Sequence, residues 1–196
     1  MSFKIENFII KPLTTFNYVK PLHLSYIQNG IQRNWEAVKS LDSVAVLLYH
    51  TQKKAFVLVK QFRAPVYMSD NAITFTYELC AGLVDKQSSI EQITKEEIDE
   101  ECGYDVPLEK IEKITSFHTN VGQSGSKQYL FYAEVDDSMK IHDGGGLKDE
   151  EIIVEYLDIS QAKAFIFDEA KAKTPGLMFA FYWFFENFPE LTNELL

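Results

Sequence analysis

The chain has 196 residues, 46% hydrophobic and 24% charged, an ordinary composition for one globular domain with a small extension. Its 19 basic and 29 acidic side chains give a net charge of -10, which disfavours phosphate backbones, so we expect no nucleic-acid partner. Two cysteines are too few for a disulfide framework, and neither a secretory signal nor a membrane-spanning apolar run is evident. We therefore expect a cytoplasmic protein that has no membrane partner.

The first forty residues predict an antiparallel hairpin. Two strand-like segments, residues 22–28 and 31–36, flank Asn29-Gly30, a pair suited to the positive φ angles of a two-residue turn. Further strands are expected at residues 42–50, 55–62, 73–79, 113–118, 127–135 and 151–159. We divide the chain into an N-terminal β extension, residues 1–40, and a main domain, residues 41–196.

Two or three helices are expected among these strands, and two of them can be placed. Over residues 88–102 the apolar residues recur at helical spacing, with a capping box of Ser88 and Glu91 at the start of the segment and Gly103 at its end. A second helix begins after Thr174, and its aromatic side chains should pack on the sheet. Strands with a helix on each face predict an α+β fold, in which a mixed β-sheet is sandwiched between helices.

Two glutamates lie on the face of the first helix that should be buried. At about 100° per residue, Glu97 and Glu101 flank the midline of the apolar face, and Glu100 lies at its edge. Burying neighbouring carboxylates is costly unless a positive charge meets them, and no Lys or Arg occupies this face. A hard divalent cation would satisfy them. The alternative is a helix at the domain edge whose glutamates are solvated.

A specific spacing surrounds these glutamates. Over residues 82–104 it is carried by Gly82, Glu97, Ile98, Glu100, Glu101, Gly103 and Tyr104. The spacing resembles the Nudix box of the Nudix hydrolases, G-x5-E-x7-R-E-U-x-E-E-x-G-U, in which U is apolar. The resemblance implies the Nudix fold and metal-dependent hydrolysis of a diphosphate bond.

Two positions depart from the family pattern. Its first Glu is Ser88 in this chain, and its Arg is Glu96, with Lys95 beside it. Because the family's Arg braces the metal-binding carboxylates, the support of these side chains is left open. Lys95 could reach in, although the helical wheel places it on the outer face. Neither departure removes a direct metal ligand.

Segments outside the box are similar to the ADP-ribose and UDP-sugar diphosphatase branch: VKQFRAPVY at 59–67, YELCAGLVD at 77–85 and GGGLKDEEI at 144–152. Cys80 stands where ADP-ribose enzymes usually have Pro, so the resemblance to UDP-sugar diphosphatases is greater. It implies that water attacks a nucleoside diphosphate sugar such as UDP-glucose and yields UMP and a sugar 1-phosphate. The alternatives are an ADP-ribose diphosphatase that yields AMP and ribose 5-phosphate, and a Nudix-fold sensor that binds a nucleotide sugar without cleaving it.

The resemblance also implies a metal site. Matched motif to motif, Mg2+, or Mn2+ as a substitute, would be held by the Ala81 carbonyl, Glu97 and Glu101. Glu100 would share a second metal or orient the other ligands, and we also count it among the catalytic residues.

An acidic loop after the box supplies the general base in this branch. Residues 144–151, GGGLKDEE, match that loop, and Glu150 aligns best with the catalytic position. Glu151 is the alternative, as base or as a further metal ligand. The three glycines would give the loop the freedom of a hinge. The other interpretation is a surface connection whose acids are solvated.

Four residues are expected at the substrate. Arg63 matches a position that grips phosphate, to which an Arg fork is suited, and a surface ion pair is the alternative. Trp35 matches a position that stacks the nucleobase, often across a dimer interface, and ordinary packing is the alternative. The resemblance also places Glu78 and Gly82 against the substrate. By analogy we expect a homodimer in which residues 1–40 contact the partner and the base.

Overall fold

The chain divides into two compact units. The computed structural model describes residues 4–12, 14–15, 19–147 and 150–192. The first unit comprises residues 1–40 and 120–125, and the second comprises residues 41–119 and 126–196.

The first unit contains the expected hairpin. Strands β1 (Lys20–Gln28) and β2 (Ile31–Lys39) pair antiparallel along their whole length. The turn residues Asn29 and Gly30 have φ angles of 52° and 78°. The structure therefore confirms the prediction of a two-residue turn that requires positive φ at both positions.

The second unit is built on a mixed sheet. Its strands are β3 (Ser43–His50), β4 (Ala55–Gln61), β5 (Thr76–Glu78), β6 (Cys80–Leu83), β7 (Glu112–His118), β8 (Lys127–Val135), β9 (Ile153–Asp158) and β10 (Ala172–Lys173). The main order is β10-β5-β4-β3-β8-β7, with β6 paired to β3 and β9 paired to β4. The pairs β3–β8 and β10–β5 are parallel, and the other pairs are antiparallel.

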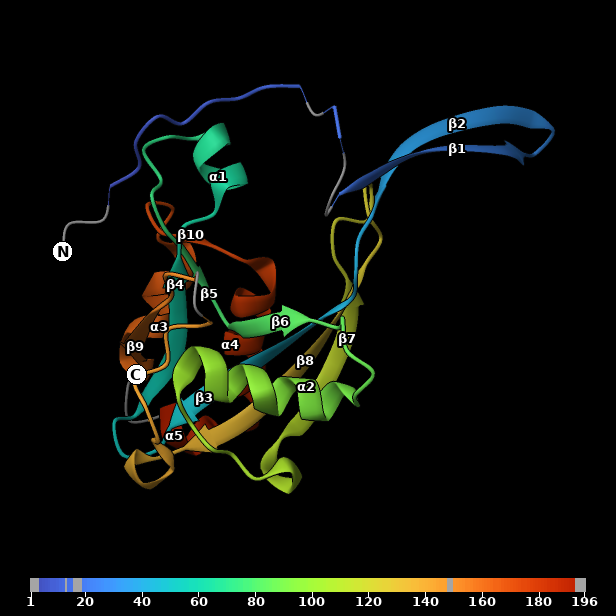
Figure 1. The fold of residues 1–196 in the computed structure, drawn as a ribbon. Coiled ribbons are helices and arrows are strands. Elements are labelled where there is room, and N and C mark those ends of the chain that lie inside the picture. Colours follow the sequence, from blue (N-terminus) through green and yellow to red (C-terminus); the bar gives the residue numbers. More distant parts are fainter. Residues whose placement is uncertain (1–3, 13, 16–18, 148–149, 193–196) are drawn as a thin grey trace. The chain divides into compact units, whose positions relative to one another are not determined.

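Helices cover both faces of this sheet (Figure 1). On one face lie α2 (Ile90–Glu97) and the π-helical turn η1 (Ile98–Cys102), and on the other lie α3 (Ile159–Phe167) and α4 (Pro175–Asn187). The remaining helical segments are α1 (Ala64–Ser69), the 3-10 turns η2 (Leu108–Lys110) and η3 (Asp137–Met139), and α5 (Pro189–Thr192). Within the described residues, no helix has the length and apolar character that crossing a membrane requires.

Alternation along the strands creates two cores. On β3, Leu47 and Tyr49 pack with α3 and α4, whereas Val46 and Leu48 pack on the other face, with α2 and η1. Successive strand side chains point to opposite faces, so an uninterrupted apolar strand can serve both layers. The structure confirms the predicted α+β sandwich.

The helix that carries the acids differs from its prediction in two ways. It is capped by Ser89, whose side chain accepts a hydrogen bond from the Gln92 N–H, and not by Ser88. It also continues after Glu97 as a π-helical turn, a feature that a uniform wheel cannot represent. Gly103, with φ 70°, ends it as expected.

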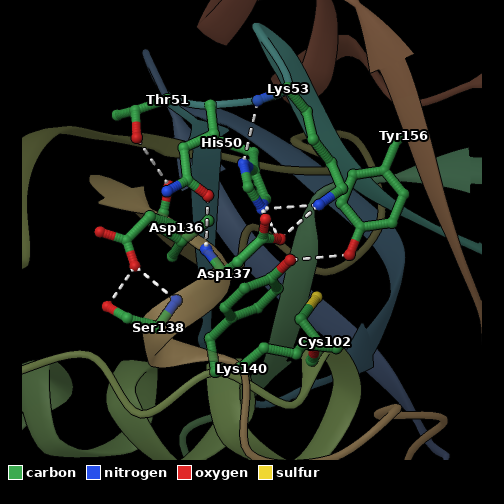
Figure 2. A network of polar contacts seen from close by, with 12 residues as sticks. His50, Thr51, Lys53, Cys102, Asp136, Asp137, Ser138, Lys140 and Tyr156 are labelled. Carbon is green, nitrogen blue, oxygen red and sulfur yellow. Dashed lines mark hydrogen bonds and ion pairs between the residues drawn. The ribbon is translucent and has the colours of Figure 1, made fainter.

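A polar network anchors the turn between β3 and β4 (Figure 2). The buried His50 ring lies 3.2 Å from Asp137, which also accepts a hydrogen bond from Lys53. Burial lowers the pKa of His50, and the charge of Lys53 lowers it further. Nearby, Lys140 Nζ donates to the Cys102 carbonyl at 2.7 Å, which satisfies the backbone where η1 ends.

Candidate active site

A cavity of about 480 Å³ opens in the second unit beside the end of α2. The described residues that line it are Ser43, Gln61, Arg63, Glu78, Ala81, Gly82, Leu83, Asp85, Lys86, Glu97, Glu100, Glu101, Gln128, Leu147 and Glu150. Eight of the ten predicted site residues are among them. Glu151 and Trp35 are the two that are not.

Glu97 reaches the cavity across a glycine. A methyl group at Gly82 would come within 1.9 Å of Glu97 Oε1, so only glycine leaves room for the carboxylate where it lies. Burial raises the pKa of Glu97 to about 7, and repulsion from Glu100 adds to the rise. A nearby positive charge would therefore stabilise the ionised form of this carboxylate.

Glu101 is the most buried acid of the group, with 5% of its surface exposed. Its Oε2 accepts a hydrogen bond from the Ala81 N–H at 2.9 Å, which ties η1 to β6. Burial raises the pKa of Glu101 to about 8, and the charge of Glu97 also raises it, although the Ala81 hydrogen bond acts in the opposite direction. Two adjacent carboxylates thus share an environment that penalises their ionisation.

The donor chemistry fits a hard divalent cation. No three His, Cys, Asp or Glu side chains within the described ranges are arranged to enclose a metal ion. Magnesium does not require such a cage, because it is usually bound through one or two carboxylates, with waters and substrate phosphates as further ligands. Glu97 and Glu101 supply that number of carboxylates at the cavity wall.

The triple glycine packs against the end of the helical segment. The N–H groups of Gly145 and Gly146 donate to the carbonyls of Glu101 and Glu100, at 2.9 and 3.0 Å. Gly144 has φ 74°, and a Cβ there would lie 2.3 Å from the Glu101 carbonyl oxygen. Sequence analysis assigns these glycines hinge freedom. The structure gives a further reason for glycine here, since all three residues have positive φ and Gly144 also approaches the backbone closely.

The two candidate bases differ in position. Glu150 lines the cavity, and its Oε2 accepts a hydrogen bond from the Leu147 N–H at 2.9 Å. Glu151 is exposed and is not among the described lining residues. Residues 148 and 149 lie outside the described ranges. The geometry therefore favours Glu150 as the acid that faces a ligand in the cavity.

Arg63 is held by a bidentate ion pair. Its Nε and one terminal nitrogen each donate to Glu78 at 2.8 Å, and Thr76 Oγ1 donates to Glu78 Oε1 at 2.6 Å. Burial alone would raise the pKa of Glu78, but the bonds from Arg63 and Thr76 hold it below its ordinary value. Glu78 therefore orients Arg63 instead of offering a free carboxylate to a substrate. Thr76 was not among the predicted site residues, although it stands two positions before Glu78 in a predicted strand, where alternate side chains share a face.

A second ion pair joins the loop after β6 to α2. Lys86 Nζ lies 2.8 Å from Glu96 Oε2, and Glu96 Oε1 accepts a hydrogen bond from Gln92 at 3.2 Å. Lys95 pairs with Asp105 at 2.7 Å. Lys95 therefore does not take over the bracing role of the family's Arg, and Glu96, which stands at that Arg position, is itself paired with Lys86. One sequence signal for this pair was available: Lys86 stands ten residues before Glu96, and Glu96 occupies the position of the family's Arg.

Trp35 belongs to the first unit. Its indole Nε1 donates to the Gly122 carbonyl at 2.9 Å, and about half of the side chain is exposed. It lines a hollow of about 590 Å³ together with Pro21, Asn34, Glu36, Ala37, Val38, Gly122 and Gln123. Its predicted role in base stacking stays a prediction.

Comparison with known proteins places the chain in a family. No protein-family model matches it. It is 35% identical to a uridine diphosphate glucose pyrophosphatase of Bos taurus, over 93% of this chain and 95% of the relative. It is 33% identical to the Mus musculus protein of the same name, over 86% and 88% of the two chains. A GDP-mannose pyrophosphatase of Cronobacter sakazakii is 40% identical over 62% of each chain. Together with the box and its cavity, these similarities show that the chain is an enzyme of the Nudix hydrolase family.

Proposed function

We propose that this enzyme is a magnesium-dependent diphosphatase of nucleoside diphosphate sugars, with UDP-glucose as the preferred type of substrate. The observation that carries the proposal is the pair Glu97 and Glu101, two carboxylates at one cavity whose pKa values are raised to about 7 and about 8. The names of the mammalian relatives support the choice of UDP-glucose.

The metal would be held at the end of α2. Glu97, Glu101 and the backbone carbonyl of Ala81 would be its protein ligands, with Glu100 beside them at the cavity. When bound, Mg2+, or Mn2+ in its place, would neutralise charge on the diphosphate and make water easier to deprotonate.

The chain's own side chains would transfer the proton and grip the substrate. Glu150 would take a proton from water as the water oxygen bonds to one phosphorus. The bond between that phosphorus and the bridging oxygen would break, which gives UMP and glucose 1-phosphate. Arg63, already oriented by Glu78, would donate to phosphate oxygens. Glu151 is the alternative base.

Product analysis of the purified protein tests the proposal. UDP-glucose, GDP-mannose and ADP-ribose are each incubated with Mg2+, with Mn2+ and with a chelator. We expect UMP and glucose 1-phosphate, formed fastest with Mg2+ and abolished by chelation. Faster release of AMP and ribose 5-phosphate, or of GMP and mannose 1-phosphate, would overturn the choice of UDP-glucose as the substrate. Tight binding of UDP-glucose without turnover would favour a sensor.

We propose further that the hairpin contacts a second copy of the chain. Every residue of β1 is exposed, and Leu22, Leu24 and Tyr26 lie on one of its faces. An isolated two-stranded hairpin is at best marginally stable in water, so it needs a surface to cover it. Light scattering should give twice the chain mass, and Leu24→Lys should reduce it towards the monomer. A monomeric wild type would refute the proposed dimer and would leave the proposed activity unaffected.

A further inference from the structure

The cavity of the proposed active site carries far more negative than positive charge. Its described lining contains two cations, Arg63 and Lys86. It contains six acids, which are Glu78, Asp85, Glu97, Glu100, Glu101 and Glu150. The acids outnumber the cations by four, and even with Glu97 and Glu101 protonated they outnumber them by two. A diphosphate brings further negative charge, so each cation that faces the cavity matters to binding.

The two cations are held in the same manner. Arg63 is fixed by a carboxylate that also accepts a hydrogen bond from a neutral side chain, Thr76. Lys86 is fixed by Glu96, whose other oxygen accepts a hydrogen bond from Gln92. Because Glu96 belongs to α2, its ion pair ties the loop that follows β6 to the helix that carries the acids. Each cation is therefore ordered before a ligand arrives, which reduces the entropy lost on binding.

Among the described residues, Glu96 is the hydrogen-bond partner of Lys86, which leaves donors of the ammonium group for a ligand. An ammonium group carries three N–H donors, and the bond to Glu96 uses one. The side chain is 44% exposed and lines the cavity together with Glu97 and Glu100. The bond to Glu96 raises the pKa of Lys86, and the charges of Glu100 and Glu97 raise it further, so the group stays protonated at neutral pH.

We propose that Lys86 is a second substrate-binding residue, which donates to the diphosphate group of the nucleotide sugar while Glu96 positions it. This inference rests on the proposed function. In this arrangement the Arg63 fork and the Lys86 ammonium both contact the diphosphate, and the cation held by the carboxylates offsets the remaining charge. Sequence comparison with the box pattern marks Glu96 only as a departure, and its pairing with Lys86 gives that departure a role.

The test uses UDP-glucose in which a methylene group replaces the bridging oxygen, so that binding is measured without turnover. Titration calorimetry with Mg2+ gives the affinity of the wild type and of Lys86→Met, and steady-state assays give KM and kcat. We expect Lys86→Met to weaken binding and raise KM about tenfold or more, as for a hydrogen bond to a charged group, with kcat within about twofold. Lys95→Met is the matched control, since Lys95 pairs with Asp105 and is not among the described lining residues.

Exchanging the charges of Lys86 and Glu96 distinguishes a contact with the substrate from an ion pair that only holds the loop against α2. The double variant Lys86→Glu with Glu96→Lys can restore an ion pair, but it directs a carboxylate into the cavity. We expect it to bind at least as weakly as Lys86→Met, and Glu96→Gln to lie between Lys86→Met and the wild type. Recovery of wild-type affinity in the double variant, or unchanged affinity in Lys86→Met, would overturn the proposal.

The failure of the two proposals can be told apart. If the wild type binds the analogue and Lys86→Met binds it equally well, the role of Lys86 is wrong and the proposed function stands. If the wild type neither binds the analogue nor hydrolyses UDP-glucose, both are wrong. Thermal unfolding of each variant tests whether a loss of affinity is caused by a loss of fold. We expect melting temperatures close to that of the wild type, because an exposed ion pair contributes little to stability.

Discussion

Replacing Gly82 by alanine should disable the enzyme without unfolding it. The added Cβ would lie 1.9 Å from Glu97 Oε1, whereas ordinary van der Waals contact begins at 3.4 Å, so the carboxylate must retreat by about 3.4 - 1.9 = 1.5 Å. A misplacement of about 1 Å in an active site can cost roughly 100-fold in rate. We therefore expect kcat for UDP-glucose to fall about 100-fold and the Mg2+ concentration for half-maximal activity to rise.

Stability separates this mechanism from a folding defect. The nearest atoms that the new methyl group meets belong to the end of the Glu97 side chain and not to backbone, so the strand and helix need not move. The melting temperature of Gly82→Ala should stay within a few degrees of the wild type. Gly122→Ala is the control, because a Cβ at Gly122 meets nothing within 4 Å. Wild-type kcat in Gly82→Ala would refute the claim that this glycine positions Glu97.

Three further predictions concern the same cavity. Glu150→Gln should lower kcat about 100-fold or more while Glu151→Gln changes it a few-fold at most, and the reverse result in steady-state assays would move the base to Glu151. Thr76→Val removes a hydroxyl that holds the partner of Arg63, so KM should rise up to about tenfold with little change in kcat, and an unchanged KM would contradict this role. In chelator, calorimetry should show a melting temperature that falls between pH 6 and about pH 8.5. The pKa of Glu101 is raised from 4.5 to about 8, so its contribution is fully present below pH 4.5 and is lost as pH rises through about 8. Glu101→Gln should weaken this dependence and leave the part due to Glu97, whose pKa is raised to about 7, and Mg2+ should oppose both parts. A metal-free stability that rises with pH would show that burial does not govern these carboxyls.

The acids of α2 and η1 could be predicted because their determinants are local. Helical spacing predicts Glu97 and Glu101 on one face, and both line the same cavity although a π-helical turn follows Glu97. The burial of Glu101 to 5% exposure agrees with its place on the apolar side. The hairpin turn was predictable for the same reason, since Asn29-Gly30 sets its own backbone geometry. Local patterns of this kind need no knowledge of distant contacts.

Some local signals were nevertheless missed. Helix α3 begins where Asp158 accepts a hydrogen bond from the Ser160 N–H, and its buried residues recur at helical spacing. Strand β9 ends at Asp158 and α3 begins at the next residue, so no turn residues separate them. The apolar pattern of the strand therefore hides the start of the helix. The shift of the α2 cap from Ser88 to Ser89 is a one-residue error of the same type.

The partners of the cations depend on contacts that a sequence pattern does not specify. Arg63 and Glu78 are fifteen residues apart and meet because β4 pairs with β5. Lys86 and Glu96 meet because the loop after β6 folds back along α2. Arg63 and Glu78 could therefore be predicted as site residues from the sequence, but neither the bond between them nor the place of Lys86 at the cavity could.

The end of η1 explains why the acids and the candidate base lie at one cavity. The carbonyls of Glu100 and Glu101 accept hydrogen bonds from Gly146 and Gly145, so the backbone next to two acids also fixes the start of the loop that carries Glu150. A helix end leaves carbonyls without intrahelical partners, and here the loop satisfies two of them. A Cβ at Gly144 would lie 2.3 Å from the Glu101 carbonyl oxygen, so a side chain there would push the loop away from the helix. A Cβ at Gly146 would instead lie 2.4 Å from Glu150 Oε2 and would displace the proposed base. These two of the three glycines that suggest a mobile loop in the sequence therefore help to set the distance between the proposed metal ligands and the proposed base.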